Sequence, residues 1–236
     1  MGRMIAYKRP DGGDAPAYYA EPPNHSNGDV PDTGPGIVIV QEWWGVTAEI
    51  MAIADRYAQL GYRVLIPDLF RGRKAAVGDE ANHLAEGLDF EDAALQDIRG
   101  AILHLKEQTR KKVGVTGYCM GGALAFITAM KCKEPDAAVI FYGHPPPQAG
   151  DPATIEIPLL CHFAKYDEFF AADRAQEIAK RLDEGKVPYE VHWYDAKHGF
   201  CNPNQPGNAG LGNYNAEACQ LAWQRTVTFW ERVLSS

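Results

Sequence analysis

Short apolar runs alternate with segments of helical periodicity over most of the chain. Residues 36–41 (GIVIVQ) form an unbroken apolar series rich in β-branched residues. Such a series is typical of a strand buried on both faces, as in a parallel sheet. Segment 48–60 instead places its apolar residues roughly on one helical face, and Gly61 follows as a helix stop. The pattern therefore predicts a buried strand followed by a surface helix.

This alternation continues to the C-terminus. We predict strands at 4–8, 17–20, 36–41, 62–67, 113–119, 137–143, 158–164 and 187–194. We predict helices at 48–60, 80–108, 121–131, 172–184 and 214–234, with the second divided near Leu88 and Asp89. Segment 22–36 is rich in turn-forming residues and is predicted to be a loop. Strands and helices in this order predict a single α/β domain over residues 1–236, with a mostly parallel sheet flanked by helices.

The composition fits one such domain and narrows its partners. The chain has 236 residues, of which 46% are hydrophobic, enough for a large core. A formal net charge of −8 argues against nucleic acid or an anionic membrane surface as the main partner. No apolar run approaches the length of a membrane span, and the N-terminus lacks the apolar core of a secretory signal. We expect a cytoplasmic protein, a monomer or small homo-oligomer, that binds a small molecule.

The five cysteines argue against a disulfide framework or a structural zinc site, because their number is odd and no CxxC pair occurs. Four of them are expected to be packed or loop thiols in a reducing compartment, namely Cys132, Cys161, Cys201 and Cys219. Cys201 lies three residues after His198, which leaves a minor redox or metal role open. We expect no metal and no other cofactor, since no glycine-rich dinucleotide motif follows the first strand.

Cys119 has a different context. In Gly117-Tyr118-Cys119-Met120-Gly121 it stands at a predicted strand-to-helix junction, with a glycine two positions to either side. Such a sharp turn holds the central residue in a strained conformation with its side chain above the sheet. The helix N-terminus favours a thiolate and stabilises an oxyanion, to which the Met120 N–H can donate. We predict that Cys119 is a nucleophile; the alternative is a buried cysteine in a tight turn.

A cysteine nucleophile requires a base. In folds with this turn, an acid and then a histidine follow the nucleophile along the chain. His198 falls between the last predicted strand and the closing helix, which favours it as the base over a solvated loop histidine. Asp167 lies just past strand 158–164 and is the favoured acid; Glu168 and Asp173 are alternatives, and a surface or helix-capping role is the other interpretation. His144 also follows a strand and could line a pocket.

Several motifs together resemble the dienelactone hydrolase family, and their order matches along nearly the whole chain. The matching segments are Gln41-Glu42-Trp43-Trp44-Gly45, Pro67-Asp68-Leu69, Gly117-Tyr118-Cys119-Met120-Gly121-Gly122, Asp167 and His198-Gly199-Phe200. The resemblance implies an α/β-hydrolase fold and a Cys-His-Asp triad. It also implies hydrolysis of a lactone or ester through a thioester intermediate.

The resemblance also implies roles for two residues of the first motif. Glu42 would contact the resting thiol, be displaced by substrate, and then help to deprotonate Cys119. The backbone N–H of Trp43 would be the second oxyanion donor. The alternative for Glu42 is a cap on the helix that begins near residue 48.

One departure from the family changes the expected substrate. The type enzyme grips a substrate carboxylate with arginines, one of them four residues after the catalytic histidine, where this chain has Asn202. Region 78–83 has no arginine either, and Arg71 or Arg73 as a substitute would more often be solvated or ion-paired. We therefore expect a pocket for neutral acyl or aryl esters. The aromatic residues expected around its mouth are Trp43, Trp44, Tyr118, Phe169, Phe170 and Phe200.

Two other functions remain open at this point. The same triad could act on neutral phosphotriesters, whose tetrahedral centre also suits an oxyanion hole. A non-catalytic binding or thiol-redox protein could share the scaffold, because a fold does not determine a function. The complete set of catalytic residue types in the right chain order favours the ester or lactone hydrolase.

Overall fold

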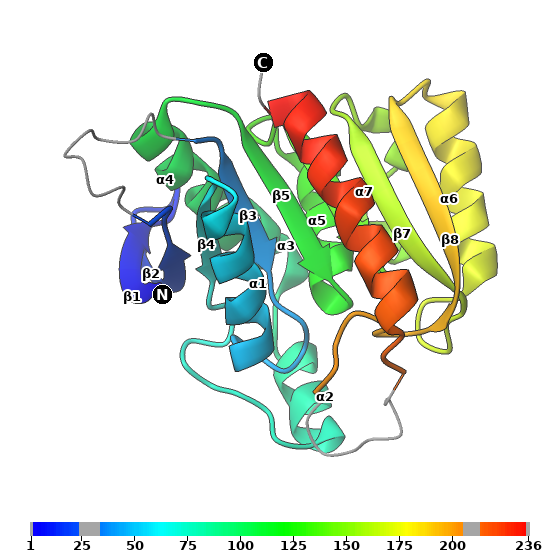
Figure 1. Cartoon of the computed structure of the whole chain (residues 1–236), viewed down its shortest axis with the longest axis horizontal. Helices are drawn as coiled ribbons and strands as arrows, with labels where there is room; N and C mark the ends of the chain where they lie inside the picture. The colour runs from blue at the N-terminus through cyan, green and yellow to red at the C-terminus, as the bar shows by residue number, and fades with distance from the viewer. Residues whose placement is uncertain (1, 24–33, 205–212, 235–236) are drawn as a thin grey trace.

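One sheet of eight strands runs through the computed structural model, which describes residues 2–23, 34–204 and 213–234 (Figure 1). The strands are β1 (Arg3–Lys8), β2 (Asp14–Ala20), β3 (Gly36–Val40), β4 (Arg63–Pro67), β5 (Val113–Tyr118), β6 (Ala137–Phe141), β7 (Leu159–Tyr166) and β8 (Tyr189–Lys197). Their order across the sheet is β1-β2-β4-β3-β5-β6-β7-β8. β2 pairs antiparallel with β1 and β4, and all other pairs are parallel. The predicted α/β fold is confirmed; most of the predicted loop 22–36 lies outside the described residues.

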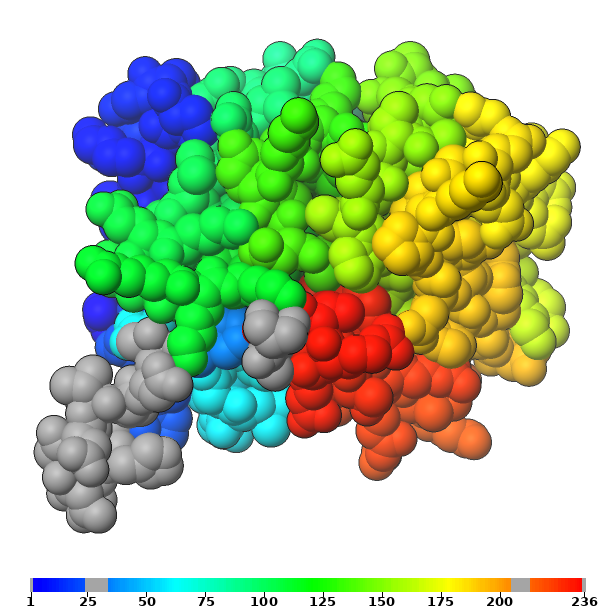
Figure 2. All heavy atoms as spheres, turned by 90° about the horizontal axis from the view of Figure 1, so that it is seen from above, coloured from blue at the N-terminus to red at the C-terminus, as the bar shows by residue number. Residues whose placement is uncertain are grey.

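Helices cover both faces of the sheet. They are α1 (Ala48–Gln59), α2 (Gly78–Glu86), α3 (Phe90–Asp92), α4 (Arg99–Thr109), α5 (Met120–Lys131), α6 (Ala172–Glu184) and α7 (Ala216–Leu234). α1 and α7 lie on one face, and α4, α5 and α6 lie on the other (Figure 1). Figure 2 shows these layers from above, with the cyan and red segments on one side and the green and yellow segments on the other. No helix in the described ranges is long and apolar enough to cross a membrane.

The double cover explains the sequence of the central strands. Every residue of β3, β5 and β6 is buried, as the unbroken apolar runs predict, because helices exclude water from both faces. The parallel strands end at one edge of the sheet, where α2 lies (Figure 1). Loops that leave this edge therefore start from a rigid base.

The predicted break in segment 80–108 is also present. α2 ends at Glu86, and Asp89 caps the next helical segment by accepting hydrogen bonds from the N–H groups of Glu91 and Asp92 (2.9 and 3.0 Å). A π-helical turn at Ala93–Ile98, which we did not predict, then joins α3 to α4.

Candidate active site

Cys119 occupies the turn between β5 and α5. Its φ of 56° and ψ of −121° are unusual for a residue with a side chain. Its N–H donates to the Phe141 carbonyl (3.0 Å), and its own carbonyl accepts from the Gly122 N–H (2.9 Å). A side chain at Gly117 would overlap the Gly121 carbonyl, so this position requires glycine. The motif thus forms the sharp turn that the sequence predicts.

Three side chains from three different loops meet at this turn. His198 directly follows β8, and its Nε2 lies 3.1 Å from Cys119 Sγ. Its Nδ1 lies 2.9 Å from Oδ2 of Asp167, which directly follows β7. The other oxygen of Asp167 accepts the N–H groups of Phe169 and Phe170 (2.9 and 2.8 Å). A carboxylate held at Nδ1 fixes the tautomer and orientation of the imidazole.

The alternative acids lie elsewhere. Glu168 is an exposed carboxylate 3.6 Å from Lys197 Nζ, and Asp173 lies in the first turn of α6. Of the three candidates, Asp167 is the one that contacts His198.

The charge state of His198 follows from its neighbours. Burial alone would lower its pKa, because it penalises the charged imidazole. The negative charge of a Cys119 thiolate and the hydrogen bond to Asp167 outweigh burial and raise the pKa of His198 to about 10. The raised pKa favours a protonated His198, which then carries a proton for a leaving group.

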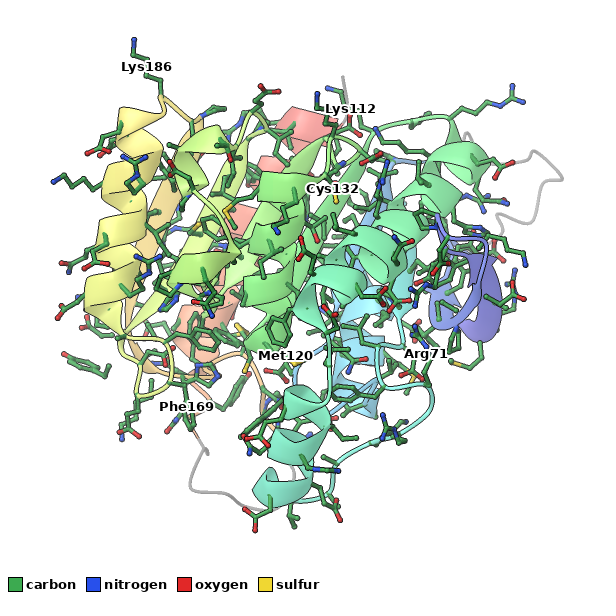
Figure 3. All side chains as sticks on the ribbon, turned by 180° about the vertical axis from the view of Figure 1, so that it is seen from behind. Arg71, Lys112, Met120, Cys132, Phe169 and Lys186 are labelled. Carbon is green, nitrogen blue, oxygen red and sulfur yellow. A yellow bond between two sulfur atoms is a disulfide. The ribbon has the colours of Figure 1, made fainter. Side chains whose placement is uncertain are left out.

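Cys119 forms part of the wall of a cavity of about 420 Å³, called here the Cys119 cavity. Its other lining residues are Trp43, Ala85, Phe90, Met120, Ala123, His144, Pro145, Pro146, Pro147, Phe169 and Phe170. No lysine, arginine, aspartate or glutamate occurs among these described residues. Met120 and Phe169 lie at the edge of the sheet next to α2 (Figure 3). Met120 is the first residue of α5, so its N–H has no acceptor within the helix.

Three of the aromatic residues predicted around the mouth line this cavity, namely Trp43, Phe169 and Phe170. The other three predicted residues, Trp44, Tyr118 and Phe200, do not line it. Trp44 is buried with Ala75 and Ala81 in a separate cluster. Tyr118 stacks on Phe141 at 4.4 Å, and Phe200 is fully buried against Tyr142 and Tyr194. Trp44 and Tyr118 each adjoin a cavity residue in the chain, namely Trp43 and Cys119, but they are buried away from the cavity itself.

Glu42 lies in a different environment from its neighbour Trp43. Its buried carboxylate accepts a hydrogen bond from the side-chain amide of Asn202, which is also buried. Burial raises the pKa of Glu42 to about 7, although the Asn202 hydrogen bond and the charge of His198 act in the opposite direction. The observed partner of Glu42 is thus Asn202, while the thiol contacts His198. The helix-cap alternative is wrong, because the cap residue of α1 is Thr47.

Glu42 and Asn202 line a second cavity of about 350 Å³, called here the Glu42 cavity. Ile50 and Ile53 of α1 give it an apolar side, and Glu49, Arg56, Tyr118 and Tyr142 add polar groups. Arg71 and Arg73 line neither cavity. Arg71 pairs with buried Asp97 (2.8 and 2.9 Å), and Arg73 Nε donates to the Phe70 carbonyl. Arg56 of α1 is the arginine that lines the Glu42 cavity among the described residues.

The expectation of free thiols was wrong for one pair. Cys201 and Cys219 form a disulfide between the loop after β8 and the first turn of α7, with Cα atoms 4.9 Å apart. They meet because α7 folds back on this loop, where the Asn215 N–H donates to the Phe200 carbonyl (3.0 Å). Cys119, Cys132 and Cys161 are free and buried. No group of three His, Cys, Asp or Glu side chains in the described part of the chain is placed to share a metal ion.

Sequence reasoning missed Tyr142, which follows β6. It has a φ of 38°, and its ring packs edge-on against His198 at 5.3 Å. It also lines the Glu42 cavity. Its position in the sequence could have indicated this role. Tyr142 follows the carboxyl end of β6, the strand beside β5, and ligands of α/β sheets bind at the carboxyl ends of the strands. His144, two residues later, lines the Cys119 cavity as its place after a strand suggested.

Comparisons with known proteins agree with these motifs. The model of the dienelactone hydrolase family matches residues 16–234. Protein usf of Aquifex pyrophilus is 31% identical over 245 aligned positions that cover 100% of both chains. A carboxymethylenebutenolidase of Rhodococcus opacus is also 31% identical, over 86% of this chain and 84% of the relative.

Solved structures agree on the fold. A dienelactone hydrolase-like promiscuous phosphotriesterase from metagenomic libraries has a TM-score of 0.80 at 21% identity, over 99% of both chains. The family model spans most of the chain, and relatives match along its length. The chain therefore belongs to the dienelactone hydrolase family and is a hydrolase that acts on lactones or esters.

Proposed function

We propose that this enzyme hydrolyses small, uncharged carboxylic esters or lactones through an acyl-enzyme on Cys119. His198 acts as acid and base, and Asp167 orients it. The main support is the unbroken series of contacts from Asp167 through His198 to Cys119, which ends at the wall of an apolar cavity.

The first half-reaction forms a thioester. The Cys119 thiolate attacks the carbonyl carbon, and the carbonyl oxygen becomes an oxyanion that accepts hydrogen bonds from the N–H groups of Met120 and Trp43. When the carbonyl re-forms, the C–O bond of the ester breaks and the leaving oxygen takes a proton from His198. An ester releases its alcohol, whereas a lactone keeps the new hydroxyl on the acyl chain.

The second half-reaction restores the enzyme. Neutral His198 takes a proton from water, whose oxygen attacks the thioester carbon. The C–S bond then breaks, so that Cys119 returns to a thiolate beside protonated His198 and the carboxylic acid leaves. Asp167 stabilises the imidazolium in both halves without itself taking a proton.

The gating role of Glu42 stays a prediction. A move of its carboxyl group to the thiol must break the hydrogen bond from Asn202. Such a gate would therefore depend on Asn202, the residue that stands where the type enzyme has an arginine.

A second candidate is hydrolysis of neutral phosphotriesters. The lining of the Cys119 cavity, without Lys, Arg, Asp or Glu, favours uncharged substrates of either kind. Thiolate attack on phosphorus, with loss of an aryl oxide, would use the same base and the same N–H groups. Rates with an aryl acetate and with a neutral diethyl aryl phosphate would separate the two candidates.

The test is steady-state hydrolysis of an aryl acetate by the wild type and by Cys119→Ala. We expect Cys119→Ala to lose at least about a thousandfold in kcat/KM, because nucleophilic attack is impossible. Cys132→Ala is the matched control, since Cys132 is a free, buried cysteine that lines neither cavity. Equal rates for Cys119→Ala and the wild type would contradict the proposed mechanism.

A further inference from the structure

Three aromatic rings pack against His198. They belong to Phe169 and Phe170 in the loop after β7 and to Tyr142 after β6, and their centroids lie 5.0, 5.5 and 5.3 Å from that of the imidazole. The ring of Phe170 is nearly parallel to the imidazole, with 25° between the planes, whereas Phe169 and Tyr142 are tilted by 51° and 75°. Of the three, Phe170 therefore presents the face of its ring to His198.

Contacts of both its backbone and its ring fix the position of Phe170. Its N–H donates to Oδ1 of Asp167 (2.8 Å), the carboxylate whose other oxygen lies at His198 Nδ1. Its ring also packs edge-on against His144, with centroids 5.1 Å apart and planes at 89°. Phe170 thus anchors the acid through its backbone and covers the base with its side chain, which holds the acid and the base in a fixed relation.

The ring face of Phe170 suits a positive charge on His198. The face of a phenyl ring carries partial negative charge, which attracts a cation within about 6 Å of the ring centre. His198 lies within that range and is buried, so water screens the attraction little. Burial itself disfavours the charged imidazole. A ring face at this position therefore offsets part of the lost hydration and favours the imidazolium over the neutral ring.

Ionisable groups also face His198 from four other parts of the fold. They are Cys119 at the turn before α5, Asp167 after β7, Tyr142 after β6 and, through its charge, Glu42 after β3. None of them is altered when only the side chain at position 170 is changed. A change in the titration of His198 that follows the electron density of that ring therefore reports on the ring itself.

We propose that Phe170 is a positioning residue of the reacting centre, whose ring face holds the imidazole of His198 in place and stabilises its protonated form. The inference deepens the proposed function and rests on it, because it concerns the proton that His198 gives to the leaving oxygen. Phe170 acts through His198 and takes part in no bond that forms or breaks. Without the ring face, His198 loses its proton at a lower pH, and less of the enzyme is ready to protonate the leaving group.

The test replaces the phenylalanine at position 170 by 3,5-difluoro- and 3,4,5-trifluorophenylalanine, which nearly keep its shape but withdraw electrons from the ring face. The pH midpoint of His198 is followed by NMR of enzyme with ¹³C-labelled histidine and no substrate, and the signal missing from His198→Asn identifies this residue among the seven histidines. We expect the midpoint to fall with each added fluorine, by about half to one unit for the trifluoro form. A purely structural role would leave the midpoint unchanged across this series.

Ordinary substitutions connect this titration to catalysis. In Phe170→Leu, kcat/KM for an aryl acetate should fall about three- to tenfold, and its alkaline limb should move to lower pH with the NMR midpoint. Phe170→Tyr keeps the ring and should restore both values. Phe90→Leu is the matched control, since Phe90 lines the same cavity without a ring contact to His198 among the described residues. It should alter KM but leave the midpoint and the alkaline limb in place.

The NMR titration separates this inference from the proposed reaction, because it needs no substrate. A midpoint that falls with the number of fluorine atoms would support the role of Phe170 even if no ester were hydrolysed. The same midpoint in the native and trifluorinated enzymes, or an equal fall in Phe90→Leu and Phe170→Leu, would overturn it even if an aryl acetate were a good substrate. The fluorinated forms keep the test decisive if Phe170→Leu fails to fold.

Discussion

The two cavities beside the nucleophile turn have opposite chemical character. The Cys119 cavity is lined by aromatic rings and prolines, and its lining has no Lys, Arg, Asp or Glu. The Glu42 cavity contains Glu42, Glu49, Arg56 and Asn202 and is bordered by the disulfide between Cys201 and Cys219. Neighbours in the chain separate the two environments, because Trp43 lines the first and Glu42 the second.

This separation shows how the fold can use charge without presenting it to a substrate. Electrostatic interactions are stronger where water and mobile charges are excluded, so the Cys119–His198 pair acts in an apolar setting. Buried Glu42 instead lies in the Glu42 cavity, which is lined by residues of α1 and of the loop after β8. The comparison suggests three substitutions, with the largest expected effect first.

The first substitution is Asp167→Asn, which acts on the side of the Cys119 cavity. An amide at this position cannot stabilise the imidazolium and favours the wrong tautomer of His198. We expect kcat/KM for an aryl acetate to fall about a thousandfold or more, with little change in thermal stability. Asp173→Asn, which changes an exposed carboxylate in the first turn of α6, is the matched control and should stay within about twofold. Similar rates for the two variants would remove Asp167 from the mechanism.

The second substitution is Glu42→Gln, which tests the buried charge of the Glu42 cavity. The pKa of Glu42 is about 7, against a usual 4.5, so its proton is held more tightly in the folded state. The folded protein therefore loses stability as pH rises from about 4.5 to about 7, on the order of 3 kcal/mol for a shift of this size. Glutamine keeps an acceptor for Asn202 and does not ionise, so Glu42→Gln should escape this loss.

Denaturant unfolding below about pH 4.5 and at about pH 8 measures this effect. The difference in free energy of unfolding between Glu42→Gln and the wild type should increase in favour of Glu42→Gln as pH rises. Glu177→Gln is the control, since Glu177 is an exposed residue paired with Arg174. Parallel pH profiles for Glu42→Gln and the wild type would mean that Glu42 is not a strained buried acid.

The third substitution, Asn202→Ala, removes the partner of Glu42. It leaves a buried carboxylate oxygen without its donor, which should destabilise the protein by about 2 kcal/mol at neutral pH. Asn204→Ala changes an exposed residue of the same loop and should cost less than about 0.5 kcal/mol. In the double variant Glu42→Gln with Asn202→Ala, the cost of losing Asn202 should shrink, because a neutral amide needs the donor less.

Much of the fold and of the reacting centre could be predicted because both depend on short-range patterns. The apolar run at 36–41 is buried on both faces, and glycines flank Cys119 where no side chain fits. Asp167 and His198 directly follow β7 and β8, so strand ends alone bring them near the turn.

The rest depends on contacts between segments far apart in the chain. The loop after β3 packs against α2, and this packing determines that Trp43 rather than Trp44 lines the cavity. The local sequence pattern does not predict this packing. The bond between Glu42 and Asn202 joins residues 160 positions apart. The disulfide between Cys201 and Cys219 depends on the way in which α7 returns over its preceding loop. The odd number of cysteines argued against a framework of several disulfides, but it could not predict one disulfide between two particular cysteines.

The central claim is that Cys119 carries the acyl group, and the most direct test is mass spectrometry of the enzyme quenched during turnover of an aryl acetate. The account predicts one acetyl group, located by peptide mapping on Cys119 and absent from Cys119→Ala, while Cys132→Ala is labelled like the wild type. An acetyl group on another residue, or active enzyme in which Cys119 is chemically blocked, would contradict it.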